Sequence, residues 1–220
     1  MPSIDVQKAR FNMIEQQIRP WNVLDTGVLE LLASVRRDAF VADAHKALAY
    51  ADLEIPLPGG QSMLAPRLEA RLLQDLAVKK TDKVLEIGTG SGFLTALLAH
   101  QAASVLSLEI NPELASMART NLRNAGIQNA EVREADGSKT ASAEGTYDAI
   151  LLSGSVSEIP QSLLGLLKVG GRLAAIVGDD PIMRATIVTR KGNAEFTTAQ
   201  SWDAIVPRLQ NFPESARFAF

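Results

Sequence analysis

The sequence predicts an α/β fold in which a doubly wound, mostly parallel sheet of seven strands is covered by helices on both faces. Apolar strand-like segments and helical segments alternate from residue 82 onward, which is typical of parallel sheets. The strand-like segments are apolar on successive residues, as expected for strands that are buried on both faces. The last two segments flank Lys191-Gly192-Asn193, a hairpin signal, so we expect the sheet to end in an antiparallel strand pair.

Each predicted element is assigned from its apolar pattern and from the residues that begin or end it. The predicted strands are 83–87, 104–110, 130–135, 147–152, 171–177, 185–190 and 195–200. The predicted helices that alternate with them are 92–100, 112–125, which Gly126 closes as a C-cap, and 160–167. The antiparallel ending favours the methyltransferase variant of the Rossmann-like sheet over the dinucleotide-dehydrogenase variant.

An N-terminal helical extension precedes this sheet. We expect one helix over 5–19, ended by Pro20, and a second from the N-cap Asp25 to about residue 35. The stretch 55–62 is too rich in Pro and Gly for a regular element, and Pro66 begins the next helix, which continues to about Ala77. We therefore expect residues 1–80 to form the extension with a loop that covers the substrate and cofactor. Residues 81–220 then form the core of the same structural unit.

Composition excludes several classes of protein. A chain of 220 residues that is 46% hydrophobic can bury one sizeable core. The net charge of −3 and the lack of a Lys/Arg run argue against a nucleic-acid partner. The absence of Cys and the presence of two His argue against a disulfide, a Cys nucleophile and a metal site. We find no signal-peptide pattern in the first ten residues and no apolar run near the ~20 residues of a membrane span, so we expect a cytoplasmic protein.

Three glycines form the most informative motif. Gly88, Gly90 and Gly92 follow the first strand and open the next helix, where a ligand can approach the backbone and helix N-terminal amides face it. Their spacing is Gly-x-Gly-x-Gly, whereas the dinucleotide fingerprint is Gly-x-Gly-x-x-Gly. Glu86 precedes them; its carboxylate would repel a pyrophosphate but favours the cationic methionine part of S-adenosylmethionine. The alternative is a tight strand–helix turn without a ligand.

Two further carboxylates lie at predicted strand ends. Glu109 ends the second strand, where a carboxylate can accept hydrogen bonds from both hydroxyls of a ribose. Asp136 and Gly137 follow the third strand, where the Asp can accept from an adenine amino group. Each has a simpler alternative: Glu109 can cap the helix that begins at Pro112, and Asp136 can belong to an Asp-Gly turn. Taken with the glycines, the two carboxylates predict S-adenosylmethionine as the cofactor and S-adenosylhomocysteine as its product.

Several blocks of the sequence resemble the protein-L-isoaspartate O-methyltransferases, a branch of the class I S-adenosylmethionine-dependent methyltransferases. The most specific is Gly60-Gln61-Ser62-Met63-Leu64-Ala65-Pro66, which is similar to the family's Gly-Gln-Thr-Ile-Ser-x-Pro loop. The block 84–92 matches the family's cofactor motif. Shorter similarities lie at 37–41, 50–52, 55–57, 147–150, 158–160 and 167–173. The resemblance covers roughly residues 5 to 210.

The resemblance implies methylation of the free α-carboxylate of L-isoaspartyl residues in damaged proteins or peptides. A carboxylate is already anionic at pH 7, so it needs no general base. Catalysis can then rest on holding the nucleophile in line with the methyl group and on excluding water. A chain with no Cys and few His can perform this reaction.

One residue departs from the family pattern. Leu64 stands where the family carries its active-site Ser, while Ser62 aligns with the family's Thr and becomes the candidate catalytic residue. Loss of one polar contact costs about 1–3 kcal/mol, or ten- to a hundredfold in rate. Leu64 therefore favours either weaker isoaspartyl activity or another small-molecule or protein acceptor.

The resemblance and the motifs together name the candidate cofactor-binding residues. They are Gln61, Ser62, Met63, Glu86, Gly88, Thr89, Gly90, Gly92, Glu109, Ile110, Asp136, Gly137 and Ser153. Two other classes remain open at this point, a cofactor-binding module without catalysis and a nucleotide-binding dehydrogenase. The sequence leaves the oligomeric state open.

Overall fold

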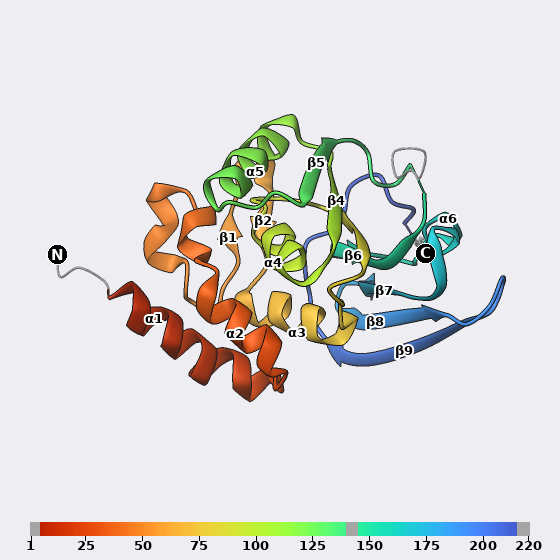
Figure 1. Ribbon diagram of the computed structural model, residues 1–220, viewed down its shortest axis with the longest axis horizontal. Helices are drawn as coiled ribbons and strands as arrows, with labels where there is room; N and C mark the ends of the chain where they lie inside the picture. Colours follow the sequence, from red (N-terminus) through yellow and green to blue (C-terminus); the bar gives the residue numbers. More distant parts are fainter. Residues whose placement is uncertain (1–4, 140–144, 215–220) are drawn as a thin grey trace, which may run out of the picture.

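A computed structural model describes residues 5–139 and 145–214 and confirms the predicted sheet (Figure 1). Seven strands lie in the order β5-β4-β3-β6-β7-β8-β9, with parallel pairing from β5 to β7 and antiparallel pairing of β8 with both neighbours. Their bounds are β3 (Lys83–Ile87), β4 (Ser104–Glu109), β5 (Ala130–Glu134), β6 (Tyr147–Val156), β7 (Leu167–Asp179), β8 (Ile182–Arg190) and β9 (Phe196–Asp203). Residues 1–4 of the predicted extension and residues 215–220 of the predicted core lie outside the described residues.

Strand β6 is longer than its apolar run predicts. The polar residues Ser153 and Ser155 follow the run, yet the strand continues to Val156. Ser155 is fully buried because the C-terminal segment, residues 204–214, satisfies its polar groups: its N–H donates to the Pro207 carbonyl (2.8 Å) and its hydroxyl to the Val206 carbonyl (3.0 Å). A distant part of the chain thus supplies the partners that keep this polar stretch in the sheet.

Helices cover the two faces unequally. One face is packed by α4 (Phe93–Gln101), α5 (Pro112–Asn124) and the N-terminal helices, and the other by α6 (Gln161–Gly165) and Phe212 of the C-terminal segment. Alternate strand residues divide between two cores: Val84 faces the larger core, whereas Leu85 and Ile87 face the smaller one.

The N-terminal extension is helical, as predicted. Its elements are α1 (Val6–Met13) with a π-helical turn (Ile14–Ile18), 3-10 turns at Arg19–Trp21, Arg37–Phe40, Asp43–Leu48 and Pro58–Gly60, α2 (Thr26–Ser34), the short pair β1 (Ile55–Pro56) and β2 (Ser62–Met63), and α3 (Pro66–Leu76). Asp25 is the N-cap of α2, and its side chain accepts from the N–H of Val28 (3.0 Å). The extension shares the larger core with α4 and α5, so it is packed onto the sheet.

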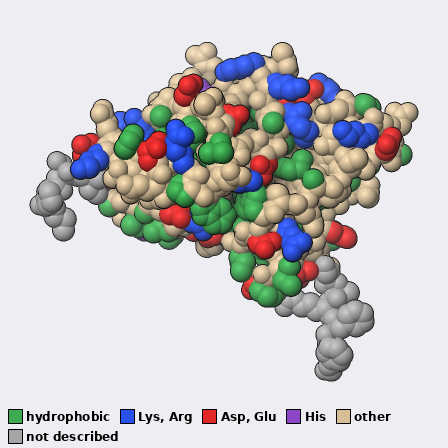
Figure 2. All heavy atoms as spheres, turned by 90° about the horizontal axis from the view of Figure 1, so that it is seen from below, with side chains coloured by type: hydrophobic (Ala, Val, Ile, Leu, Met, Phe, Trp, Pro, Cys, Tyr) green, Lys and Arg blue, Asp and Glu red, His purple; other side chains and the backbone are tan. Residues whose placement is uncertain are grey.

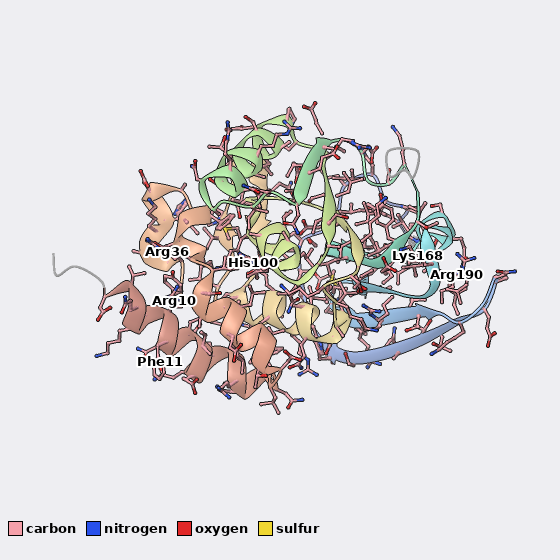
Figure 3. All side chains as sticks on the ribbon, in the orientation of Figure 1. Arg10, Phe11, Arg36, His100, Lys168 and Arg190 are labelled. Carbon is pink, nitrogen blue, oxygen red and sulfur yellow. The ribbon has the colours of Figure 1, made fainter. Side chains whose placement is uncertain are left out.

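Charged side chains of both signs are spread over the face shown in Figure 2, with hydrophobic side chains gathered near its lower middle. In Figure 3, Lys168 of β7 and Arg190 of β8 lie close to α6, where Arg190 donates to the Leu167 carbonyl (2.5 Å) and Lys168 pairs with Asp148 (2.7 Å). Among the described residues, no helix combines the length and the apolar character that crossing a bilayer requires.

Candidate functional site

A cavity with an empty volume of about 640 Å³ lies at the carboxyl ends of β3, β4, β5 and β6. In doubly wound sheets, ligands bind at this edge of the sheet. Most of the predicted site residues line it: Gln61, Ser62, Gly88, Gly90, Glu109, Ile110, Asp136, Gly137 and Ser153. The fold thus brings together residues that lie as far apart in the sequence as Gln61 and Ser153.

The glycine loop, residues 88–92, turns through left-handed backbone conformations. Gly88 has φ +94° and Gly92 has φ +86°, a region that side chains rarely adopt. A Cβ on Gly88 would lie 2.9 Å from Leu209 Cδ2 at the cavity wall, whereas a Cβ on Gly92 would lie 3.2 Å from Ala118 Cβ in α5. Gly92 therefore allows α4 and α5 to pack closely, and it does not line the cavity.

Glu109 anchors the glycine loop to the next strand. One carboxylate oxygen, Oε2, accepts from the N–H of Gly90 (2.9 Å), and the other, Oε1, accepts from the N–H of Asn111 (2.9 Å). The side chain is buried but borders the cavity. Each oxygen has a second lone pair, so the carboxylate can still accept from a pair of hydroxyls in the cavity.

Asp136 and Gly137 form the wall beyond β5. Asp136 accepts from the N–H (3.0 Å) and the hydroxyl (2.7 Å) of Ser138 through Oδ1, and from Asn211 through Oδ2 (3.0 Å). A Cβ on Gly137 would lie 2.3 Å from Ile87 Cγ2, so only glycine allows this approach to β3. The close approach to Ile87 therefore explains why residue 137 is a glycine, whether or not it also forms a turn.

Glu86 is placed differently from the expectation that it faces a cationic ligand. It is fully buried and does not line the cavity, because hydroxyls from three elements enclose its carboxylate: Thr95 (2.5 Å), Ser107 (2.7 Å) and Ser153 (2.9 Å). Burial raises the pKa of Glu86 to about 7, against the opposing effect of these three hydrogen bonds. Strand alternation turns this side chain under α4 rather than into the cavity.

A second, smaller cavity with an empty volume of about 290 Å³ lies between the glycine loop and the covering loop, residues 57–65. Met63 and Thr89, both predicted site residues, line this cavity and not the first. The two cavities share the residues Ser62, Leu64, Gly88, Gly90 and Ser153. The Leu64 carbonyl accepts from Arg37 Nη2 (2.7 Å), which ties the covering loop to the buried core.

Ser62, the candidate catalytic residue, lies where the cavities meet, and its hydroxyl donates to Glu54 Oε2 (2.7 Å). Its lone pairs remain available, but its proton is engaged. Gln61 makes only a long contact with the Gly59 carbonyl (3.5 Å), so its amide is the freer donor of the covering loop.

The C-terminal segment was absent from the predicted site. It crosses the edge of the sheet, where Leu209 donates its N–H to the Ser155 carbonyl (2.9 Å) and Arg208 pairs with Asp179 (2.6 Å). The residues of this segment that line the first cavity are Pro207, Arg208, Leu209, Gln210 and Phe212. No residue pattern in this segment marks a site; only its apolar residues after the last strand signal that it packs against the sheet.

The described residues contain no group of three or more His, Asp or Glu placed to hold a metal ion. The cavity walls instead offer carboxylates, glycine amides and apolar side chains such as Leu108 and Phe212. These groups suit a neutral or cationic organic ligand with hydroxyls and a flat ring.

The sheet order, the glycine loop and the carboxylates at successive strand ends define an α/β protein of the methyltransferase type. Residues 8–207 match the sequence profile of the Protein-L-isoaspartate(D-aspartate) O-methyltransferase family. A protein-L-isoaspartate O-methyltransferase 1 of Syntrophobacter fumaroxidans is 42% identical over 176 residues, covering 80% of this chain and 82% of that protein. One from Koribacter versatilis is 38% identical over 182 residues, covering 83% of this chain and 82% of that protein. The chain belongs to the protein-L-isoaspartate O-methyltransferase family.

A solved structure supports the fold. A Plasmodium falciparum protein, described as a protein-L-isoaspartate O-methyltransferase in complex with S-adenosyl-L-homocysteine, superposes with a TM-score of 0.80. The superposition covers 94% of this chain and 99% of that one at 21% identity, so the likeness concerns the fold.

Proposed function

We propose that this chain is an S-adenosylmethionine-dependent O-methyltransferase that methylates the free carboxylate of L-isoaspartyl residues in damaged proteins. The observation that supports this most is the meeting of the two cavities at Ser62, Leu64 and Ser153, in a chain of this family. One cavity suits the adenosine part of the cofactor, and the junction is where an acceptor can meet the methyl group.

The residues of the first cavity fit an adenosine. Glu109 presents a carboxylate whose geometry is already set by two backbone amides, and it would hold the ribose hydroxyls. Asp136 would accept from the adenine amino group, while Ile110 and Phe212 offer apolar surface to the ring. The glycine loop would let the cofactor lie against the backbone. Gln61, Ser62, Met63, Thr89 and Ser153 would surround its amino-acid end.

When bound, the cofactor supplies an electrophilic methyl group. The chain's own contribution is position and the exclusion of water, since a carboxylate nucleophile arrives without a proton to remove. Leu64 and Leu209 make the walls around the junction apolar, and Gln61 can donate to the acceptor carboxylate. Ser62 can accept from the acceptor's peptide N–H, because its own proton is held by Glu54.

The test is incubation of the pure protein with labelled S-adenosylmethionine and an isoaspartyl peptide. A base-labile methyl ester on the isoaspartyl peptide, and none on the matching aspartyl peptide, is the expected result. If no ester forms at high enzyme concentration, the proposal that this chain methylates isoaspartyl residues is wrong.

A second candidate function follows from Leu64. Its side chain borders both cavities and has no hydroxyl, so the acceptor side lacks a polar group that the family resemblance leads us to expect. This favours a divergent methyltransferase with another small-molecule or protein acceptor. Labelling of a cell extract with the cofactor distinguishes the two: label found only in isoaspartyl esters of proteins, with none in small molecules, would exclude the second candidate.

Other features of this proposal rest on the sequence. A protein or peptide acceptor is in keeping with the family. A cytoplasmic location, the absence of metal and nucleic-acid partners, and the division into 1–80 and 81–220 stay predictions. Cell fractionation tests the cytoplasmic location, and metal analysis of the purified protein tests the absence of a metal.

A further inference from the structure

Glu69 of α3 is a buried carboxylate that borders the second cavity and was not among the predicted site residues. Glu69 is 3% exposed, and it lines this cavity together with Thr89 and Ser91. One oxygen, Oε2, accepts from Arg37 Nη1 in a buried ion pair. Among the described residues none donates a hydrogen bond to the other oxygen, Oε1. An unpartnered carboxylate oxygen at a cavity wall can accept from a ligand.

The charges around the glycine loop are not balanced. Glu69, Glu86 and Glu109 are all buried there, whereas within residues 5–139 and 145–214 Arg37 is the only buried arginine or lysine. Burial and the negative charge of Glu86 raise the pKa of Glu69 to about 7, against the opposing charge of Arg37. A cation in the second cavity would relieve this excess of negative charge.

Of these carboxylates, only Glu69 is presented to the second cavity. Glu86 is enclosed by three hydroxyls, and Glu109 borders the first cavity, where its oxygens hold backbone amides. The second cavity continues from the first along Gly88, Gly90 and Ser153. A ligand whose adenosine part lies beside Glu109 and Asp136 therefore extends its other end toward Glu69.

We propose that Glu69 binds the α-ammonium group of the amino-acid end of S-adenosylmethionine, the role that the sequence pattern suggests for Glu86. This inference rests on the proposed function, because it assumes that cofactor. Arg37 acts as a positioning residue: it holds one oxygen of Glu69 and the Leu64 carbonyl (2.7 Å), and its guanidinium lies 4.9 Å from the centre of the Phe93 ring. The ion pair thus fixes the carboxylate and the covering loop relative to each other.

Calorimetric binding of two ligands tests this assignment without measuring turnover. The ligands are S-adenosylhomocysteine and its desamino analogue, which lacks the α-amino group. The wild-type chain should bind the desamino analogue about ten- to a hundredfold more weakly, the range for hydrogen bonds to charged groups. Glu69→Gln should weaken binding of S-adenosylhomocysteine by a similar factor and leave binding of the analogue unchanged.

Glu86→Gln is the matched control, since it removes the other buried carboxylate beneath the same loop. It should preserve the preference for S-adenosylhomocysteine over the analogue. If Glu86→Gln abolishes that preference and Glu69→Gln keeps it, the assignment to Glu69 is wrong.

Glu69→Gln leaves Arg37 buried without its counter-ion, so the variant can lose stability. The double variant Arg37→Met with Glu69→Gln removes both charges and should show the same loss of preference in a folded chain. A double variant that retains the preference overturns the inference. A folded wild-type chain that binds neither ligand contradicts the proposed function itself, whereas equal binding of both ligands by the wild type overturns only the role of Glu69.

Discussion

Asn211 donates a hydrogen bond from Nδ2 to Asp136 Oδ2 over 3.0 Å and so ties the C-terminal segment to the loop after β5. The other oxygen, Oδ1, already accepts from the N–H and the hydroxyl of Ser138. The Lys139 ammonium lies 3.4 Å from Oδ2. The acceptor positions of Asp136 are therefore engaged, and an adenine amino group has to replace or share one of them.

We predict that Asn211→Gly strengthens binding of S-adenosylhomocysteine about three- to tenfold, since it frees an acceptor oxygen worth about 1 kcal/mol. Glycine suits this position because Asn211 has φ +63°. Calorimetry measures the change. S-inosylhomocysteine, which has a carbonyl in place of the amino group, is the control and should show no gain. Weaker binding of the adenosine ligand by the variant would refute the competition.

Glu109→Gln should reduce the affinity for S-adenosylhomocysteine about ten- to a hundredfold. The amide NH₂ of Gln would face a backbone N–H of Gly90 or Asn111, and the ribose hydroxyls would lose a charged acceptor. Glu113→Gln in the first turn of α5 is the matched control and should bind normally, because Glu113 is exposed. Equal affinities of the two variants would show that Glu109 does not contact the cofactor.

Much of the fold is readable from local sequence, because strand and helix patterns are short-range properties. The strands β3, β4 and β5 and the residues Glu109 and Asp136 at their ends follow from periodicity and turn chemistry alone. Parallel strands bring their carboxyl ends to one edge, so the first cavity could be anticipated.

Long-range packing decided what local sequence could not. Whether Glu86 faces a cavity depends on hydroxyls that come from α4, β4 and β6, and no spacing in the sequence reports that they converge. The same holds for Leu209, whose contact with the glycine loop depends on the path of the C-terminal segment. Glu69 belongs to a helix whose pattern predicts only an amphipathic element, and its place at a cavity follows from the docking of α3.

The raised pKa of Glu86 predicts a specific pH dependence of stability. Between its ordinary value of 4.5 and about 7, the folded chain retains a proton on Glu86 that the unfolded chain has lost. Rising pH therefore favours the unfolded chain over this window, and the loss is complete above pH 7. The contribution of Glu86 to the free energy of unfolding should fall by on the order of 3 kcal/mol.

Glu86→Gln isolates this contribution, because Gln does not titrate and its amide can both accept from and donate to the surrounding hydroxyls. Urea unfolding at pH 5, 6, 7 and 8 should show the variant gaining stability relative to the wild type as the pH rises to 7, and no further change at pH 8. Parallel stability curves for the two proteins across this range would contradict the burial of a proton on Glu86.

Leu64 gives the sharpest test of how the acceptor side has diverged. Leu64→Ser places a hydroxyl where the two cavities meet, and it should raise kcat/KM for an isoaspartyl peptide about ten- to a hundredfold, since one polar contact to a carboxylate is worth about 1–3 kcal/mol. The affinity for S-adenosylhomocysteine should stay within about twofold, because the cofactor contacts assigned to Glu109 and Asp136 are untouched. Leu64 is 5% exposed, so the free energy of unfolding should fall by about 2–5 kcal/mol.

Leu64→Ala separates the hydroxyl from the loss of bulk in this experiment. It enlarges the junction without adding a polar group, and we expect it to lose stability as Leu64→Ser does without gaining isoaspartyl activity. A similar gain by both variants would mean that Leu64 obstructs the acceptor sterically and that no hydroxyl is needed there. No gain by either would favour an acceptor other than an isoaspartyl residue, because the cavity would then be shaped for a group that neither variant accommodates better.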